Sequence, residues 1–102
     1  MEIMIDPNSL LGQMIKHKQI FNILLELSRN PGENISRVAK ETDITYPHTT
    51  RLVGLLYDNT MIRRCGIGRQ VNLYLTKKGQ EFTNIIIEFL NLERRYDGEK
   101  NV

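Results

Sequence analysis

The sequence predicts a mainly α-helical fold with one small β-hairpin. Apolar residues recur at helical spacing in several separate segments. Later in the chain, Val71, Leu73 and Leu75 alternate with polar or amphipathic neighbours just after two glycines, as in the return strand of a hairpin. The chain has 102 residues, close to the commonest domain size. We therefore expect residues 1–102 to form a single domain.

The first helix is predicted over residues 10–29, where apolar residues mostly keep helical spacing. The proline and glycine of "RNPGEN" end it, and Gly12 leaves open a separate leading turn. Two short helices follow within residues 34–58. Asn34 is a suitable N-cap for the first of them, and a tight turn at residues 42–43 leads to the second.

The second short helix begins in the unusual sequence "TYPHTT". Proline is tolerated in the first turn of a helix, where amide donors lack intrahelical partners. The N-cap is either Thr45 or Tyr46, because the residue before proline prefers an extended backbone whereas tyrosine is a poor cap. Val53 and Leu56 should face the core with Thr49 one turn earlier, which turns the opposite side outwards.

A hairpin is predicted over residues 61–75, with strands at residues 62–65 and 70–75. Gly66 and Gly68 permit positive φ values, so a tight connection is expected between the strands.

The last helix is predicted over residues 76–97, with Thr76 as its cap. Its apolar residues keep heptad spacing for two heptads. A helix of this length overhangs so small a unit, and a second copy of the chain is the natural cover. The expected interface of this homodimer, with help from the first helix, consists of Phe82, Ile85, Ile86, Phe89, Leu90, Leu92 and Tyr96.

The predicted order of elements is three helices, a hairpin and a last helix. This is the order of a winged helix-turn-helix, here with a long C-terminal dimerisation helix. The segments "RVAKETDIT", "TTRLVGLL" and "MIRR" resemble the first helix and turn, the recognition helix and the entering wing strand of MarR-type regulators. "LYLTKKG" resembles their return strand and next helix start. The resemblance covers about half of the chain, and compact archaeal and viral winged-helix transcription factors fit its length equally well.

The resemblance implies a sequence-specific regulator of transcription, a repressor in preference to an activator. Its recognition helix would enter the major groove of double-stranded DNA and its wing the minor groove. The chain departs from the family pattern at Thr60, where glycine is usual, and at Thr49, where an aliphatic residue is usual. Its wing "GIGR" is short, and it lacks the extra helices of longer relatives. These departures leave a small-molecule effector unassigned.

Charge is unevenly distributed along the chain. Residues 34–79 contain eight basic and three acidic side chains and sum to +5, whereas residues 1–33 sum to −1 and residues 80–102 to −2. A basic block of this kind is typical of a surface that binds a polyanion.

The residues expected to contact DNA lie on the outer face of the recognition helix, on the wing and at two helix starts. Arg51 could bind guanine or a phosphate, and Arg69 is the best candidate for the minor groove. Lys77 and Lys78 oppose the dipole of the helix that they begin, and an anionic partner would offset this. The full set is Ser36, Arg37, Tyr46, Pro47, His48, Thr50, Arg51, Arg63, Arg64, Arg69, Gln70, Lys77 and Lys78.

Other interpretations remain open. Arg51 could be a solvated charge, His48 could serve packing, and Cys65 could be a redox sensor, although a half-buried strand cysteine is the favoured interpretation. No metal-ligand cluster, cofactor motif or catalytic pattern is recognisable, so we expect no enzyme. The alternative to DNA binding is a winged-helix module for protein–protein contact within a larger assembly.

The compartment can also be predicted. Cys65 is the only cysteine, which excludes an internal disulfide and favours a reducing environment. No apolar run is long enough for a membrane span, and the N-terminus lacks the features of a signal peptide. We expect a cytoplasmic protein.

Overall fold

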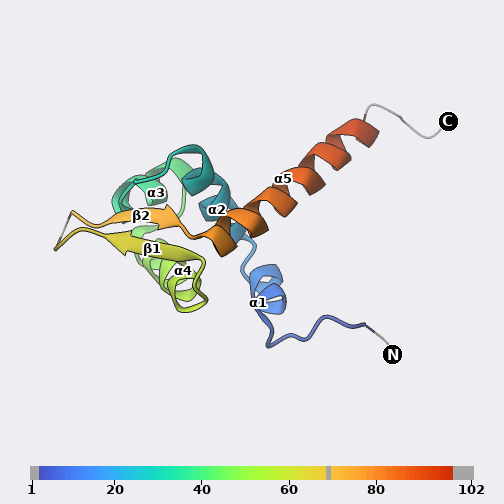
Figure 1. Cartoon of the computed structure of the whole chain (residues 1–102), viewed down its shortest axis with the longest axis horizontal. Helices are drawn as coiled ribbons and strands as arrows, with labels where there is room; N and C mark the ends of the chain where they lie inside the picture. Colours follow the sequence, from blue (N-terminus) through green and yellow to red (C-terminus); the bar gives the residue numbers. More distant parts are fainter. Residues whose placement is uncertain (1–2, 69, 98–102) are drawn as a thin grey trace.

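The computed structural model describes residues 3–68 and 70–97. It consists of helices and one two-stranded antiparallel sheet (Figure 1), which confirms the predicted fold class. The elements are α1 (Leu10–Lys16), α2 (Gln19–Arg29), α3 (Ile35–Thr42), α4 (Tyr46–Asp58), β1 (Ile62–Cys65), β2 (Asn72–Leu75) and α5 (Lys77–Asp97).

The prediction of one helix over residues 10–29 was wrong, because α1 ends at Lys16 and α2 begins at Gln19. The residues between them, His17 and Lys18, are not apolar, so the buried face of α1, with Met14, and that of α2, which starts at Ile20, need not align. Gly12 lies inside α1 and does not interrupt it.

Capping residues fix the ends of α3 and α4. Asn34 accepts a hydrogen bond from the Arg37 amide at 2.9 Å, and Asp43 ends α3 in the left-handed conformation at φ 57°. The N-cap of α4 is Thr45, whose hydroxyl accepts from the His48 amide at 3.4 Å. Tyr46 is therefore helical, even though proline follows it.

The core is built around α2, which contacts α3, α4, α5 and β2. The inner face of α4 packs there as predicted, with Thr49 as its one polar member. Thr49 is fully buried, and its hydroxyl donates to the Thr45 carbonyl at 2.8 Å. A hydroxyl that is satisfied within its own helix can occupy a core position at little cost. The largest buried apolar residues are Met14, Ile20, Ile23, Leu24, Leu27, Leu52, Leu56, Met61 and Leu73.

The hairpin pairs Ile62 with Leu75 and Cys65 with Asn72. The return strand starts at Asn72, two residues later than predicted, so the connection is longer than a tight turn. Gly66 and Gly68 adopt positive φ as expected. The outer edge of β2 is covered, because Leu73 exchanges two backbone hydrogen bonds of 2.9 Å with the loop that precedes α3.

Helix α5 starts in the body of the molecule and then projects away from it (Figure 1). Thr76 caps it as predicted, accepting from the Gly79 amide at 3.0 Å. The predicted interface residues divide into two groups. Phe82 and Ile86 pack partly against the core and Leu90 is also half-buried, whereas the exposed group consists of Ile85, Phe89, Leu92 and Tyr96.

The departure from the family pattern at Thr60 has a structural consequence. Thr60 connects α4 to β1 and has φ 58°, a conformation that is unfavourable for a β-branched residue. Its carbonyl accepts from the Thr76 hydroxyl at 2.6 Å, which holds the strained turn in place.

We predict that Thr60→Gly raises the free energy of unfolding by about 0.5–1 kcal/mol, since relief of the left-handed strain exceeds the added chain entropy of glycine. Urea denaturation followed by circular dichroism measures the change. Thr60→Ala is the matched control, because it removes the hydroxyl and keeps the strain. A glycine variant no more stable than the alanine variant would contradict the prediction.

Candidate nucleic-acid interface

The N-terminal half of α4 presents an exposed face. Tyr46, Pro47, Thr50 and Arg51 are all exposed, and the Tyr46 side chain is 54% accessible. They occupy this face because the opposite side of α4 is committed to the core. The predicted division of α4 into an inner and an outer side is therefore confirmed, with Gly54 half-buried at its edge.

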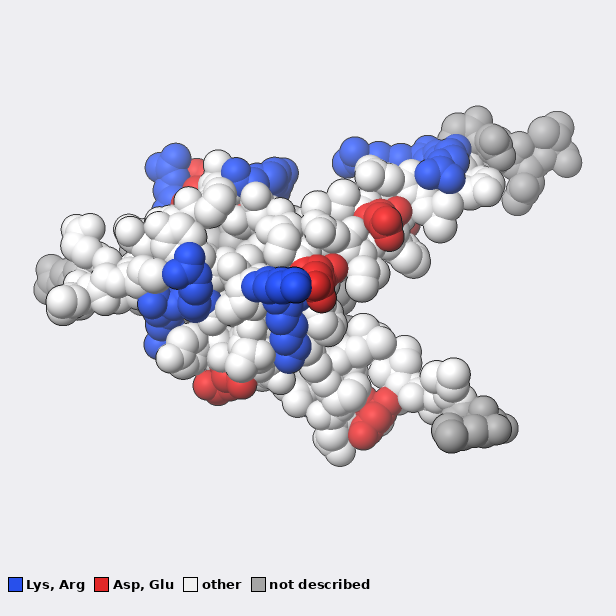
Figure 2. Space-filling view, viewed as in Figure 1, with Lys and Arg blue, Asp and Glu red and all other residues white. Residues whose placement is uncertain are grey.

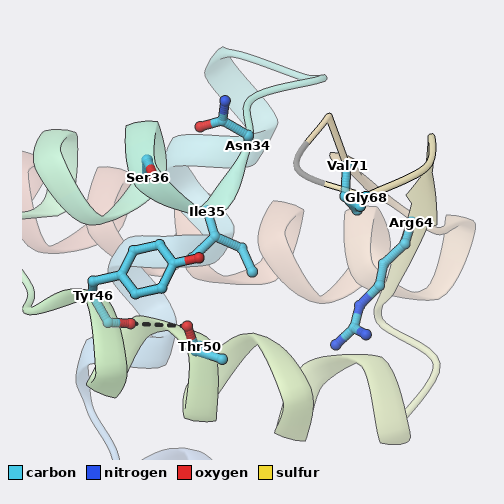
Figure 3. A pocket seen from close by; sticks show the side chains of 8 residues that line it. All are labelled: Asn34, Ile35, Ser36, Tyr46, Thr50, Arg64, Gly68 and Val71. Atoms are coloured by element: carbon cyan, nitrogen blue, oxygen red, sulfur yellow. Dashed lines mark hydrogen bonds between the residues drawn. The ribbon is translucent and has the colours of Figure 1, made fainter.

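A cleft of about 220 Å³ lies beside this face, between the starts of α3 and α4 and the hairpin. In Figure 3 the Tyr46 ring extends from α4 towards Ile35, and the Arg64 side chain points from the hairpin towards α4. The Thr50 hydroxyl donates to the Tyr46 carbonyl at 3.0 Å. The cleft is lined by Asn34, Ile35, Ser36, Tyr46, Thr50, Arg64, Gly68 and Val71.

Arg63 and Arg64 lie on opposite faces of the hairpin, because successive strand residues alternate. The Arg64 guanidinium stacks over the Tyr57 ring at 4.3 Å, on the α4 side. Arg63 stacks over Tyr74, its cross-strand neighbour, at 4.9 Å, and donates to the Cys65 sulfur at 3.4 Å. The structure therefore brings Arg64, and not Arg63, to the cleft.

The two tyrosines that hold these arginines were missed from the sequence. For Tyr74, the hairpin register was a usable signal, since it sets this ring opposite Arg63. Cys65 is half-buried in its strand, in agreement with the favoured interpretation of that residue.

Two predicted phosphate contacts are engaged within the chain. Arg37 forms ion pairs with Glu41 at 3.3 Å and with Glu33 at 3.9 Å. The Lys78 ammonium donates to the Asn59 carbonyl at 2.8 Å, at the C-terminal end of α4. The carbonyl oxygens at a helix C-terminus carry partial negative charge. This contact therefore offsets the repulsion between Lys78 and the positive end of the α5 dipole. An anionic partner is not needed to explain that lysine.

The other residues predicted to contact DNA differ in how exposed they are. His48 is half-buried, and its Nε2 atom lies 2.9 Å from the Gln19 side-chain oxygen, so it ties α4 to α2. Ser36, Gln70 and Lys77 are exposed, and Arg69 lies outside the described residues. Figure 2 shows basic side chains over the hairpin and the adjoining start of α5.

Glu33, just before α3, has an unusual environment that the sequence did not reveal. Its Oε2 atom is buried without a hydrogen-bond partner among the described residues. Burial and the neighbouring carboxyl of Glu26 raise the pKa of Glu33 from 4.5 to about 7, and Arg37 acts in the opposite direction. The backbone carbonyl of Glu33 accepts a hydrogen bond from the Leu73 amide of β2. The Glu33 side chain therefore lies where α2, α3 and the hairpin meet.

The described residues contain no group of three or more His, Cys, Asp or Glu side chains that could hold a metal ion. Within residues 3–68 and 70–97, no helix combines the length and the hydropathy needed to cross a bilayer.

No protein-family model matches the chain, and no curated protein sequence matches it. Solved structures do match. A possible HxlR family transcriptional factor from Thermoplasma volcanium has a TM-score of 0.76 and 22% identity, over 94% of this chain and 89% of that one. FabT from Streptococcus pneumoniae, in complex with DNA, has a TM-score of 0.74 and 23% identity, over 94% and 68%. MarR from Staphylococcus aureus has a TM-score of 0.72 and 20% identity, over 89% and 65%.

The chain is shorter than several of these proteins, and it spans 59% of the length of a similar structure from Mycobacterium tuberculosis. The match extends through the helix-turn-helix and the hairpin to α5, since it covers 94% of this chain in two cases. The chain therefore has the winged helix-turn-helix fold that MarR- and HxlR-type regulators share.

The raised pKa of Glu33 predicts a pH dependence of stability. The folded state binds more protons than the unfolded state between about pH 4.5 and pH 7, so the free energy of unfolding should fall as pH rises through this interval. Glu33→Gln should show a smaller fall than the unchanged protein when urea denaturation is compared at pH 5 and pH 8. Glu81→Gln, which removes an exposed carboxylate of α5 that does not act on Glu33, should retain the full fall. Equal falls in the Glu33→Gln variant and the unchanged protein would contradict this account.

Proposed function

We propose that this protein is a sequence-specific double-stranded DNA-binding regulator of transcription that acts as a homodimer. The exposed face of α4 enters the major groove and the hairpin reaches the adjacent minor groove. Occupation of an operator would make it a repressor. The proposal describes a binding protein of the cytoplasm and assigns it no catalytic activity.

The observation that carries this proposal is the exposed outer face of α4 next to Arg64. A helix that reads base edges needs its polar side chains free on one side while the other side is fixed to a core. Tyr46, Thr50 and Arg51 meet this requirement, and Thr49, Leu52 and the other inner residues supply the support. FabT, whose structure has the same fold, was solved in complex with DNA, and this supports the proposal.

The side chains expected to contact DNA phosphates can now be ranked by whether they form ion pairs or hydrogen bonds within the chain. Arg64 and Lys77 are exposed and have no ion pair within the part of the chain that the structure describes. They are the better candidates for phosphate. Arg37 and Lys78 would have to give up contacts within the chain, so they should contribute less.

The homodimer is supported by apolar surface at both ends of the chain. On α5 the exposed residues follow one side of the helix, and on α1 Leu11 and Ile15, one turn apart, are 48% and 53% exposed. Exposed apolar surface of this extent marks an interaction site. A two-fold dimer would present two copies of α4 to the two halves of a pseudo-palindromic site.

Selection from a random pool of DNA duplexes should enrich one motif with two-fold symmetry. Arg51→Ala should weaken binding to the enriched duplex by about 1–3 kcal/mol and relax its specificity if Arg51 reads a base. Fluorescence anisotropy measures both effects. Arg29→Ala, on the side of α2 that faces α5, is the control and should bind unchanged. Failure to enrich any motif would instead favour the protein–protein interaction module.

Binding should also weaken steeply with salt. Five phosphate contacts per protomer contribute roughly −4 to −5 per protomer to the slope of log K against log salt. Arg64→Ala should make the slope less negative by about one unit per protomer, since one phosphate contact is lost. Arg37→Ala should change it less, because Glu41 and Glu33 already hold that guanidinium. A slope near zero in the unchanged protein would refute phosphate binding by this face.

A further inference from the structure

The outward side of α5 carries a regular apolar stripe. Ile85, Phe89, Leu92 and Tyr96 are 64%, 67%, 44% and 58% exposed. Their spacing is that of the d, a, d and a positions of a heptad repeat. On the other side of the helix Thr83 is buried against the body. The stripe is therefore available to a partner while α5 remains packed on its own chain.

The two flanks of this stripe differ in charge. With these heptad positions, Glu88 and Arg95 occupy g positions on one flank, and Glu93 occupies an e position on the other. All three are exposed. The ion pairs found within residues 3–68 and 70–97 lie at α2 and α3 and involve none of them. Residues at e and g positions set the partner and orientation of paired helices.

We propose that α5 pairs with α5 of a second copy in antiparallel orientation, centred between Phe89 and Leu92. This inference rests on the homodimer proposed above and specifies how it is assembled. Ile85 then lies opposite the partner's Tyr96, and Phe89 opposite the partner's Leu92. All four stripe residues of each copy are covered in this register.

Charge complementarity selects this orientation over the parallel one. In an antiparallel pair the g positions of the two helices face each other, so Glu88 meets the partner's Arg95. Two-fold symmetry repeats this contact, giving two attractive pairs. In a parallel pair each g position faces an e position of the other helix, so Glu88 would meet the partner's Glu93. Both contacts would then be repulsive.

The register also fixes the distance between the two winged units. With residues 85 and 96 opposite each other, the start of one α5 is about 40 Å along the axis from the start of the other, at 1.5 Å per residue. One turn of DNA is about 34–36 Å. The antiparallel pair therefore places the two α5 starts, from which the winged units extend, at a separation on the scale of one turn of DNA.

Reversal of charge tests the orientation in the full chain. Glu88→Lys and Arg95→Glu should each raise the Kd of the homodimer by about tenfold or more at low salt, because two attractive pairs become repulsive. The Glu88→Lys/Arg95→Glu double variant should restore the original Kd. An equimolar mixture of the two single variants should form heterodimers, since each contact then joins opposite charges. Analytical ultracentrifugation measures Kd, and mixing of a tagged and an untagged chain measures heterodimers. Arg94→Glu, which makes the same charge change beside α2, is the control and should leave Kd within about twofold.

The outcomes separate this inference from the proposed function. A dimer that Glu88→Lys tightens would overturn the antiparallel arrangement in favour of the parallel one and leave the homodimer standing. A dimer that neither single variant affects would place the interface elsewhere and would also overturn the inference. A protein that is monomeric at micromolar concentration would refute the homodimer itself, while the DNA selection described above would still decide whether the chain binds DNA.

Discussion

The burial of one face of α2 is the constraint on which the rest of the structure depends. Ile20, Ile23 and Leu24 are fully buried, and α2 contacts both helices of the helix-turn-helix, the return strand and α5. The two helices of the helix-turn-helix and the return strand are too short to be stable alone in water. The outer face of α4 can carry polar side chains without loss of stability because its inner face is held against this helix. The residues proposed to bind DNA and the residues that stabilise the fold thus lie on opposite sides of α4.

Features that depend on neighbouring residues were predictable from the sequence. These include the caps of α3 and α5, the inner and outer sides of α4 and the two glycines of the wing. Contacts between distant residues were not. The attachment of Lys78 to the end of α4, the ion pairs of Arg37 and the buried carboxyl of Glu33 each require the tertiary arrangement. The distribution of basic residues along the sequence therefore indicated where positive charge gathers. Only the structure showed which of these side chains already have partners within the chain.

The stripe on α5 illustrates the same limit in a different way. Heptad spacing identified Phe82, Ile85, Ile86 and Phe89 together, because residues three and four apart share a broad face. Packing on α2 divides this face, with Ile86 turned towards the core and Ile85 towards solvent. The charged residues that flank the stripe can be assigned to e and g positions only after the exposed residues are known, since these define the side that a partner would approach.

The junction between α4 and α5 joins the helix with the exposed outer face to the projecting helix. Thr76 binds the carbonyl of Thr60 at 2.6 Å, and Lys78 binds the carbonyl of Asn59 at 2.8 Å. Both acceptors lie at the end of α4, and both donors lie at the start of α5. These two hydrogen bonds hold the end of α4 next to the start of α5, across the base of the hairpin. A change in the direction of α5 would therefore act on α4 through its C-terminal end, so whatever fixes the angle of the projecting helix also bears on the position of the exposed outer face of α4.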